Sequence, residues 1–229
     1  MKKNLILLHG ALGSAKQMQE IADALEEDFT CSLPMLSGHG GSPIPSTGYS
    51  FDLFSEDLLR FMDERKIEKS SFFGYSMGGY AAVVFAQKHP DRVERLVTLG
   101  TKFDWNPTTA SRETSMLNVD VMEQKIPAFI SFLSKVHEPV HWKDVVNETA
   151  AFMRKLGHNP PLNAESMNKI ELKTLLLVGD LDNTAGVEAT RKAAMCLNNA
   201  SFRVLASTPH PIEKVDKDVL SKLITDFLL

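Results

Sequence analysis

The chain contains 229 residues, of which 43% are hydrophobic and 24% charged, and its formal net charge is -4 at pH 7. This length and apolar content suffice to bury the core of one domain, so we expect a single domain across residues 1–229. Lysines and arginines are scattered among acidic residues and form no basic stripe that could neutralise phosphates or an anionic bilayer. The composition therefore argues against nucleic acid and membranes as partners.

The two cysteines, Cys31 and Cys196, are far apart and belong to no Cys-x-x-Cys or Cys/His cluster. Isolated thiols are typical of a reducing compartment rather than of a disulfide framework or a zinc site. The apolar run at residues 5–8 is shorter than the core of a signal peptide, and no run approaches the roughly eighteen residues of a membrane span. We therefore expect a cytoplasmic protein without a bound metal.

Short apolar runs recur along the chain and are separated by helical patterns. Apolar runs without polar alternation predict parallel strands that are buried on both faces. The runs cover residues 5–8, 29–33, 71–74, 93–99, 174–178 and 202–205. Strands that alternate with helices predict an α/β fold with an open, mostly parallel sheet of about six strands and helices on both faces. The ligand site of such a sheet lies beyond the carboxyl ends of its strands.

Two stretches carry apolar residues at helical spacing. One covers residues 51–61 after Ser50, which is a suitable N-cap. The other covers residues 212–227, and we expect this final helix to open at His210 with Pro211 in its first turn. Both patterns predict amphipathic helices that lie on the sheet.

The alternation breaks down between residues 103 and 167, where helical segments rich in aromatic residues and methionine are interrupted by prolines. Roughly sixty residues are too many for a simple connection between strands. We therefore expect a helical cap at residues 103–167, inserted into a catalytic core formed by residues 1–102 and 168–229. Most of its apolar side chains are expected to pack the cap against itself and against the core, and only a few to reach a substrate.

The segment Gly74-Tyr75-Ser76-Met77-Gly78 joins an apolar run to a helical run of small residues, which predicts a strand, a sharp turn and a helix. So tight a turn holds Ser76 in a strained conformation and raises its hydroxyl above the sheet. Gly74 and Gly78 leave room where the strand and the helix crowd together. The segment is typical of a nucleophilic serine; the alternative is a glycine-rich turn that only packs a helix on a strand.

A nucleophilic serine needs a base, and His210 is the best placed of seven histidines. It follows the run at residues 202–205, so it should lie at the same edge of the sheet as Ser76. The start of the final helix would keep its ring neutral and able to accept a proton. The remaining histidines are expected at the surface, in packing or beside the substrate (His89, His137, His141 and His158) or in loops beside glycines (His9 and His39).

The run at residues 174–178 leads into Gly179-Asp180-Leu181-Asp182, which holds two acidic residues. We favour Asp182 over Asp180 as the carboxylate that fixes the tautomer of His210. The alternative is that both acids cap a helix that starts near Val187. The chain order of nucleophile, acid and base is the order found in α/β-hydrolases.

Two glycine loops complete the pattern: His9-Gly10-Ala11 after the first strand and Gly38-His39-Gly40 after the second. Together with the serine turn, the acidic turn after the fifth strand and His210, they resemble the α/β-hydrolase superfamily over nearly the whole chain. The resemblance implies that Ser76, Asp182 and His210 are catalytic and that no cofactor is needed. It also implies an oxyanion hole formed by the backbone N–H groups of Ala11 and Met77.

The expected reaction is acyl transfer from a small carboxylic ester or thioester to water, with a modest hydrophobic group under the cap. Two alternatives stay open. The glycine loops are also similar to those of carbon–carbon bond hydrolases and of the menaquinone-pathway lyase, although only Arg112 and Arg154 in the cap could bind the lyase's anionic substrates. The other alternative is a ligand sensor of the same fold with slow turnover. The sequence determines neither the acyl and leaving groups nor the oligomeric state.

Overall fold

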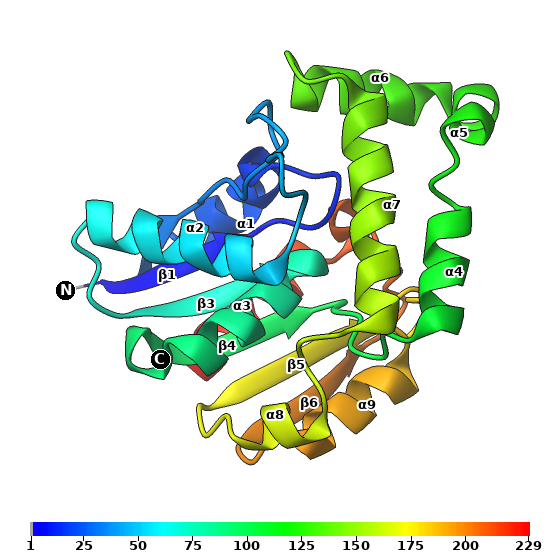
Figure 1. The fold of residues 1–229 in the computed structure, drawn as a ribbon. Helices are drawn as coiled ribbons and strands as arrows, with labels where there is room; N and C mark the ends of the chain where they lie inside the picture. Colours follow the sequence, from blue (N-terminus) through cyan, green and yellow to red (C-terminus); the bar gives the residue numbers. More distant parts are fainter. Residues whose placement is uncertain (1) are drawn as a thin grey trace.

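In the computed structural model, which describes residues 2–229, six parallel strands form one open sheet in the order β2-β1-β3-β4-β5-β6 (Figure 1). The strands are β1 (Lys3–Leu8), β2 (Phe29–Ser32), β3 (Ser70–Tyr75), β4 (Val93–Leu99), β5 (Thr174–Gly179) and β6 (Ala200–Leu205). The predicted fold class is therefore confirmed. β3 and β5 are buried along their whole length, whereas the edge strand β6 is half exposed. The prediction that β6 is buried on both faces is therefore wrong.

The register of the sheet brings the carboxyl ends of its central strands together. Leu8 at the end of β1 pairs with Gly74 of β3, and Tyr75 of β3 pairs with Leu99 of β4. Leu99 in turn pairs with Leu177 of β5. Loops that follow these four strands are therefore neighbours in space, although they are distant in the sequence.

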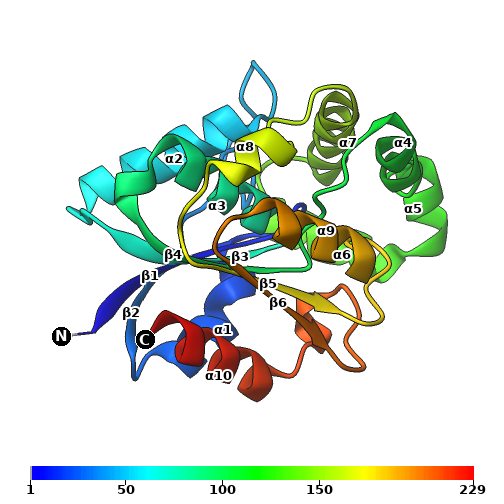
Figure 2. The same ribbon diagram turned by 90° about the horizontal axis from the view of Figure 1, so that it is seen from below.

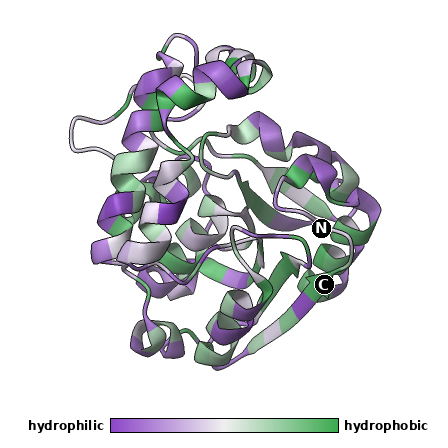
Figure 3. Cartoon of the chain, turned by 90° about the vertical axis from the view of Figure 1, so that its right-hand side faces the viewer, coloured by the Kyte–Doolittle hydropathy of each residue, from purple (hydrophilic) through white to green (hydrophobic). Residues whose placement is uncertain are grey.

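Helices cover both faces of the sheet (Figure 2). α1 (Gln19–Leu25) and α10 (Lys217–Leu228) lie on one face and enclose one apolar core with it. The other face is covered by α2 (Phe51–Glu64), α3 (Met77–Lys88), α8 (Ala164–Asn168) and α9 (Val187–Cys196), which enclose a second core. Figure 3 shows the strands as the most hydrophobic part of the interior, whereas the outer helices alternate between apolar and polar residues.

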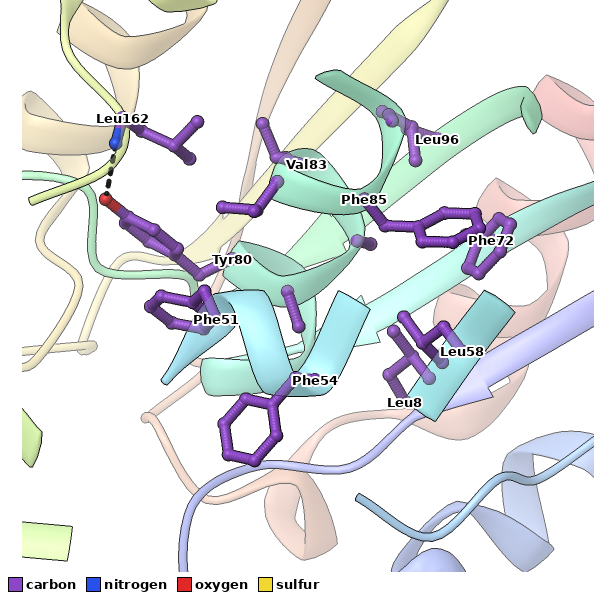
Figure 4. Close-up of a cluster of buried hydrophobic side chains, with 14 of the residues drawn as sticks. Leu8, Phe51, Phe54, Leu58, Phe72, Tyr80, Val83, Phe85, Leu96 and Leu162 are labelled. Atoms are coloured by element: carbon purple, nitrogen blue, oxygen red, sulfur yellow. Dashed lines mark hydrogen bonds between the residues drawn. The ribbon is translucent and has the colours of Figure 1, made fainter. Parts of the chain in front are cut away.

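The core under α2 and α3 is rich in aromatic side chains (Figure 4). The ring of Phe51 stacks on that of Tyr80 with 4.3 Å between the ring centroids, and Phe152 meets Phe51 edge-on. The Tyr80 hydroxyl accepts a hydrogen bond of 3.1 Å from the backbone N–H of Leu162. Aromatic rings provide large apolar contact areas, and this cluster fixes α7 (Trp142–His158), which carries Phe152, against the sheet layer.

The helix expected after Ser50 is confirmed as α2, and the Ser50 side chain accepts a hydrogen bond from the N–H of Leu53. The prediction for the final helix is wrong at its start. A short 3₁₀ helix, η3 (Ile212–Lys214), and the extended residue Val215 precede α10, which begins at Lys217 with Asp216 as its N-cap. Ile212 and Val215 are nevertheless buried, because they fill the same apolar core from a loop. His210 therefore lies outside any helix and does not open the final one.

Four helices stand beyond the carboxyl ends of the strands (Figure 1). They are α4 (Pro107–Ser115), α5 (Val119–Lys125), α6 (Pro127–His137) and α7 (Trp142–His158). α4 and α7 pack closely at Gly157, where an added Cβ would lie 2.5 Å from the Cβ of Ala110. α8 follows them in the chain but packs against α9. None of the helices in residues 2–229 is both long enough and apolar enough to cross a membrane.

The expectation that the apolar residues of this segment are packed holds for α7 and fails for the outer face of α5 and α6. Trp142 and Phe152 of α7 are buried, and so are Met122 and Leu133. Five large apolar residues of the segment are exposed: Met116, Val121, Ile126, Phe129 and Phe132. Among the described residues of α6 only Leu133 and His137 are buried, so Phe129 and Phe132 lie on the part of this helix that is not packed.

Candidate active site

Ser76 lies in the turn between β3 and α3 with a backbone φ of 52° and ψ of -117°. A positive φ is unfavourable for a residue with a Cβ and costs on the order of 1–3 kcal/mol. Hydrogen bonds to both sides of the residue hold it there. Its N–H donates to the carbonyl of Leu99 at 2.8 Å, and its carbonyl accepts from the Thr101 hydroxyl at 3.1 Å. The neighbouring strand β4 therefore stabilises the strained turn.

Two glycines make this turn possible. A Cβ added to Gly74 would lie 2.4 Å from the Cα of Gly79, and one added to Gly78 would lie 2.5 Å from the carbonyl oxygen of Leu8. Both neighbours are backbone atoms, which cannot move aside as the end of a side chain can. A methyl group at either position would therefore push strand and helix apart.

The structure brings Ser76, His210 and Asp182 together. His210 Nε2 lies 3.2 Å from Ser76 Oγ, and His210 Nδ1 lies 2.8 Å from Asp182 Oδ2. The second carboxylate oxygen of Asp182 accepts hydrogen bonds of 2.9 Å from the N–H groups of Thr184 and Ala185. Three side chains from the ends of three different strands thus form one continuous chain of hydrogen bonds.

Asp180 does not take part in this chain. It is exposed, and its carboxylate accepts a hydrogen bond of 3.0 Å from the backbone N–H of Thr208. Of the two acids after β5, only Asp182 contacts His210. The helix after them, α9, starts at Val187 and has Gly186 as its N-cap, so neither acid caps it.

Burial by itself would raise the pKa of Asp182, but the hydrogen bond and charge of His210 and the N–H groups of Ala185 and Thr184 outweigh it and hold the pKa below its ordinary value. Asp182 is therefore an anion at neutral pH. An anion at Nδ1 keeps the proton on that nitrogen and leaves Nε2 free to accept the proton of the Ser76 hydroxyl.

Tyr75 holds the loop that carries His210. Its hydroxyl donates a hydrogen bond of 3.1 Å to the backbone carbonyl of His210, and the two rings lie side by side with 5.4 Å between their centroids. Burial is the main reason that the pKa of the Tyr75 phenol is raised, so the phenol stays a donor. The sequence does not predict this contact, because Tyr75 occupies a position of the Gly-x-Ser-x-Gly pattern at which any residue is allowed.

Two residues beside Ser76, Ala11 and Met77, are candidates to supply backbone N–H groups to the site. Met77 begins α3, Ala11 follows Gly10 in the loop after β1, and both residues line the same cavity as Ser76. Within residues 2–229 neither N–H group donates to a protein acceptor. The first N–H groups of a helix lack partners inside the helix and lie at its positive end, so this corner suits a negatively charged oxygen.

Gln17 holds the loop that carries Ala11. The N–H of Gly10 donates to Gln17 Oε1 at 3.2 Å, and Gln17 Nε2 donates to Glu213 Oε1 at 3.1 Å. Because Glu213 follows His210 by only three residues, one side chain links the two loops that flank Ser76. Gln17 has no sequence signal, since it lies in a short 3₁₀ helix outside every recognised motif.

A small cavity that is partly open to solvent adjoins Ser76. Its wall comes from both the sheet layer and the segment that follows β4. The lining residues are Ala11, Phe51, Ser76, Met77, Tyr80, Lys102, Trp105, Glu113, Phe152, Met153, Leu156 and Thr184. The wall is mainly apolar, and Lys102 and Glu113 are its only charged side chains among the described residues.

Three other histidines form a buried cluster: His9, His39 and His137 at the end of α6. The sequence predicts the first two in glycine loops and the third in the cap. The ring centroids of His9 and His39 are 5.2 Å apart, and those of His39 and His137 are 6.2 Å apart. His137 Nε2 donates to the carbonyl of Leu12 at 3.0 Å, and its Nδ1 accepts from the N–H of Gly40 at 3.2 Å. The cluster therefore ties α6 to the loops after β1 and β2. No group of His, Cys, Asp and Glu side chains in residues 2–229 is arranged to hold a metal ion.

The histidine cluster predicts an acid-labile fold. Burial lowers the pKa of His9 to about 4, that of His39 well below its ordinary value, and that of His137 as well. In the unfolded chain these rings take up protons below about pH 6.5, whereas in the folded chain they stay neutral. The free energy of unfolding is therefore fully present above pH 6.5 and falls as the pH drops toward 4. At pH 5, His9 alone should account for a loss of about 2 kcal/mol.

Urea unfolding at pH 7.5 and pH 5 measures this loss. His9→Gln should have a smaller difference between the two pH values than the wild type, because glutamine does not titrate. His158→Gln, at an exposed position on α7, serves as the control and should keep the wild-type difference. An equal pH dependence in the wild type and in His9→Gln would contradict the prediction.

Comparisons with known proteins agree with this architecture. The model of a family described as alpha/beta hydrolase fold matches residues 3–119, from β1 to the start of α5. The 2-hydroxy-6-oxononadienedioate/2-hydroxy-6-oxononatrienedioate hydrolase of Paraburkholderia phymatum is 26% identical over 99% of this chain and 87% of that protein. Among solved structures, NosK from Streptomyces actuosus has a TM-score of 0.83 at 19% identity, with 99% of this chain and 97% of that chain covered. MenH from S. aureus has a TM-score of 0.77 at 20% identity, with 99% and 93% covered.

The parallel sheet and the named relatives define the class of the protein as an enzyme with an α/β architecture. Its candidate site lies at the carboxyl edge of the sheet. The chain belongs to the alpha/beta hydrolase fold family.

Proposed function

We propose that this enzyme is a serine hydrolase that cleaves a small carboxylic ester or thioester through a covalent acyl-enzyme. The observation that carries the proposal is the chain of hydrogen bonds from Ser76 through His210 to Asp182. Ser76, at one end of this chain, lines an apolar cavity. A serine hydroxyl within hydrogen-bond reach of a base, which is itself oriented by a carboxylate, is the arrangement that activates such a nucleophile.

In the first half of the reaction, Ser76 Oγ attacks the substrate carbonyl carbon while His210 Nε2 takes the hydroxyl proton. The carbonyl oxygen becomes negatively charged and is stabilised by the N–H groups of Ala11 and Met77, which have no other acceptor within residues 2–229. The protonated His210 is stabilised by Asp182 and gives its proton to the departing alcohol or thiol.

In the second half, water replaces the leaving group. His210 Nε2 accepts a proton from this water, which attacks the acyl carbon, and the same N–H groups again hold the oxyanion. The bond between the acyl carbon and Ser76 Oγ then breaks, and His210 returns the proton to Ser76. An ester or thioester suits this sequence better than an amide, because an alcohol or thiol is easier to expel.

The proposal assigns residues 103–167 to a cap over a core made of residues 1–102 and 168–229. Trp105 and α7 residues such as Phe152 and Leu156 would then cover the acyl group. A small cavity with a mainly apolar wall suits an acyl group of modest length. We therefore expect a maximum in kcat/KM within a chain-length series of esters.

The test is turnover of p-nitrophenyl esters and acyl thioesters of increasing acyl length, combined with labelling by a fluorophosphonate and peptide mass spectrometry. We expect a length optimum and a single labelled peptide that contains Ser76. Labelling at another residue, or no turnover of any ester or thioester, would contradict the proposal. Labelling of Ser76 without turnover would favour the alternative of a ligand sensor.

Carbon–carbon bond hydrolysis is the second candidate, because the relative from Paraburkholderia phymatum is matched over 99% of this chain. The same serine and histidine would then act on a ketone carbon instead of an ester. Turnover of 2-hydroxy-6-oxononadienedioate at a higher kcat/KM than any ester of the series would favour this candidate. The lyase alternative has less support, since neither Arg112 nor Arg154 is among the described residues that line the cavity.

Gln17 offers a prediction about the loop after β1. In Gln17→Ala the N–H of Gly10 loses its acceptor and the next N–H, that of Ala11, loses its fixed direction. A small misplacement of a group that stabilises the transition state is costly, so kcat should fall about 10- to 100-fold. KM should change less than kcat, because most of the cavity wall comes from residues outside this loop. Gln19→Ala, which removes an exposed side chain that bonds only to Asp23, is the control and should keep the wild-type kcat.

A further inference from the structure

A single ammonium group interrupts the apolar wall of the cavity. Lys102 follows β4 and comes directly after Thr101, whose hydroxyl donates to the backbone carbonyl of Ser76. Its side chain is only 5% exposed and lines the cavity together with aromatic residues such as Tyr80 and Phe152. A buried charge is costly unless it is paired, so the partners of Lys102 decide what it can still bind.

These partners do not use all the hydrogen-bond donors of Lys102. The carbonyl of Thr184 accepts one hydrogen bond at 3.2 Å, and Asp104 Oδ1 lies 2.9 Å from Nζ. The nearest remaining acceptor, Glu113 Oε1, lies 3.6 Å away, which is too far for a hydrogen bond. An ammonium group has three N–H donors, so at least one of them has no acceptor among residues 2–229 and is available to a ligand.

The adjacent carboxylate of Glu113 does not depend on Lys102. Its Oε1 accepts hydrogen bonds from Arg112 Nε at 3.2 Å and from Arg112 Nη2 at 2.9 Å. A ligand that takes the free N–H of Lys102 therefore leaves no buried carboxylate without a partner. The charges of Lys102 and Arg112 are balanced by those of Asp104 and Glu113. Because the group has no net charge, its ligand need not be an anion, and a ketone oxygen suits the free donor as well as a carboxylate does.

We propose that Lys102 is a specificity-determining residue that binds an oxygen acceptor on the acyl group of the substrate. The acceptor is a ketone or carboxylate oxygen, separated from the scissile carbonyl by an apolar spacer that lies against the aromatic wall. This inference rests on the proposed function and refines its substrate class from a plain hydrocarbon acyl group to an oxygenated one. A plain alkyl chain would leave the buried donor without an acceptor, and sites built to hydrogen-bond a substrate discriminate strongly against analogues that lack the polar group.

The test uses phenyl esters of three acid series over a range of chain lengths: alkanoic acids, keto acids and dicarboxylic acids. For the wild type, kcat/KM of at least one oxygenated series should exceed that of the alkanoate of equal length by about 10- to 100-fold, as expected for a hydrogen bond to a charged group. Lys102→Met keeps the length of the side chain and removes the ammonium group, and should bring this ratio close to one. Lys102→Arg should retain most of the ratio, because the positive charge and the donors remain.

Lys143→Met is the matched control. Lys143 forms an ion pair with Glu123 at 2.7 Å in the same segment but is not among the described residues that line the cavity, so the substrate ratio should stay at the wild-type value. If Lys102→Met does not fold, the double variant Lys102→Met/Asp104→Leu removes both members of the 2.9 Å ion pair and answers the same question.

The two proposals fail in different ways. If the wild type hydrolyses alkanoate esters but prefers neither oxygenated series, or if Lys102→Met keeps the preference, the role of Lys102 is refuted and the serine hydrolase stands. If no ester of any series is hydrolysed, the proposed function itself fails, and the inference about Lys102 fails with it.

Discussion

Replacement of Ser76 by alanine is expected to lower kcat/KM for p-nitrophenyl esters by about four to six orders of magnitude. Loss of the attacking oxygen leaves only the N–H groups of Ala11 and Met77 and the binding of the acyl group to assist direct attack by water, and such residual catalysis is small. The fold should persist, because alanine retains the Cβ and the backbone hydrogen bonds of Ser76 to Leu99 and Thr101. Initial rates and thermal unfolding measured on the same preparation check both statements.

Ser42→Ala is a suitable control for this substitution. Its hydroxyl donates only to the backbone carbonyl of His39, in a loop that does not contribute to the cavity above Ser76. Turnover by this variant should stay within a factor of about three of the wild type, as for a side chain outside the reacting groups. If Ser76→Ala retained ester turnover in a preparation free of wild-type enzyme, the role of Ser76 as nucleophile would be ruled out.

The second large effect is expected for Asp182→Asn, with a decrease in kcat of about 10⁴-fold. The N–H groups of Thr184 and Ala185 donate to one oxygen of this side chain and would hold the amide oxygen of asparagine in the same place. The amide NH₂ would then point at His210 Nδ1 and donate to it. The proton of the imidazole would move to Nε2, which could no longer accept the proton of Ser76.

Asp180→Asn tests which of the two acids after β5 orients His210. Asp180 bonds to the backbone of Thr208 and lies away from His210, so kcat of this variant should remain within about tenfold of the wild type. A large loss in Asp180→Asn with near-normal turnover in Asp182→Asn would reverse the assignment. Circular dichroism on both variants shows whether any loss reflects unfolding.

Local patterns in the sequence predicted most of the sheet and the turn that carries Ser76. Apolar runs of strand length identified all six strands to within two residues at each end, because a strand buried on both faces leaves a continuous apolar signature. The edge strand β6 was found as a strand but misjudged in its burial, since a short apolar run does not reveal how many neighbours a strand has. The start of the final helix was misplaced because Ile212 and Val215 fill the core from a loop and mimic helical spacing.

The candidate site divides in the same way. Ser76, His210 and Asp182 each follow a strand whose carboxyl end is recognisable, so their approach could be expected from parallel strand order alone. Tyr75, Gln17 and Lys102 could not be found, because their roles depend on contacts with residues far away in the sequence. Lys102 touches Thr184, 82 positions further along the chain, and no spacing rule connects the two.

What the sequence alone determined is the part of this protein that local patterns encode: the parallel α/β class, the glycines that permit a strained serine, and the three side chains that meet at the candidate site. What only the tertiary structure decided is which buried polar groups have partners. Packing of α4 and α7 beyond the sheet places Lys102 and Glu113 in an apolar wall, and packing of α6 buries His9, His39 and His137. Burial changes the free energy of a charge or a donor by an amount that depends on every surrounding element, and no local pattern contains that information.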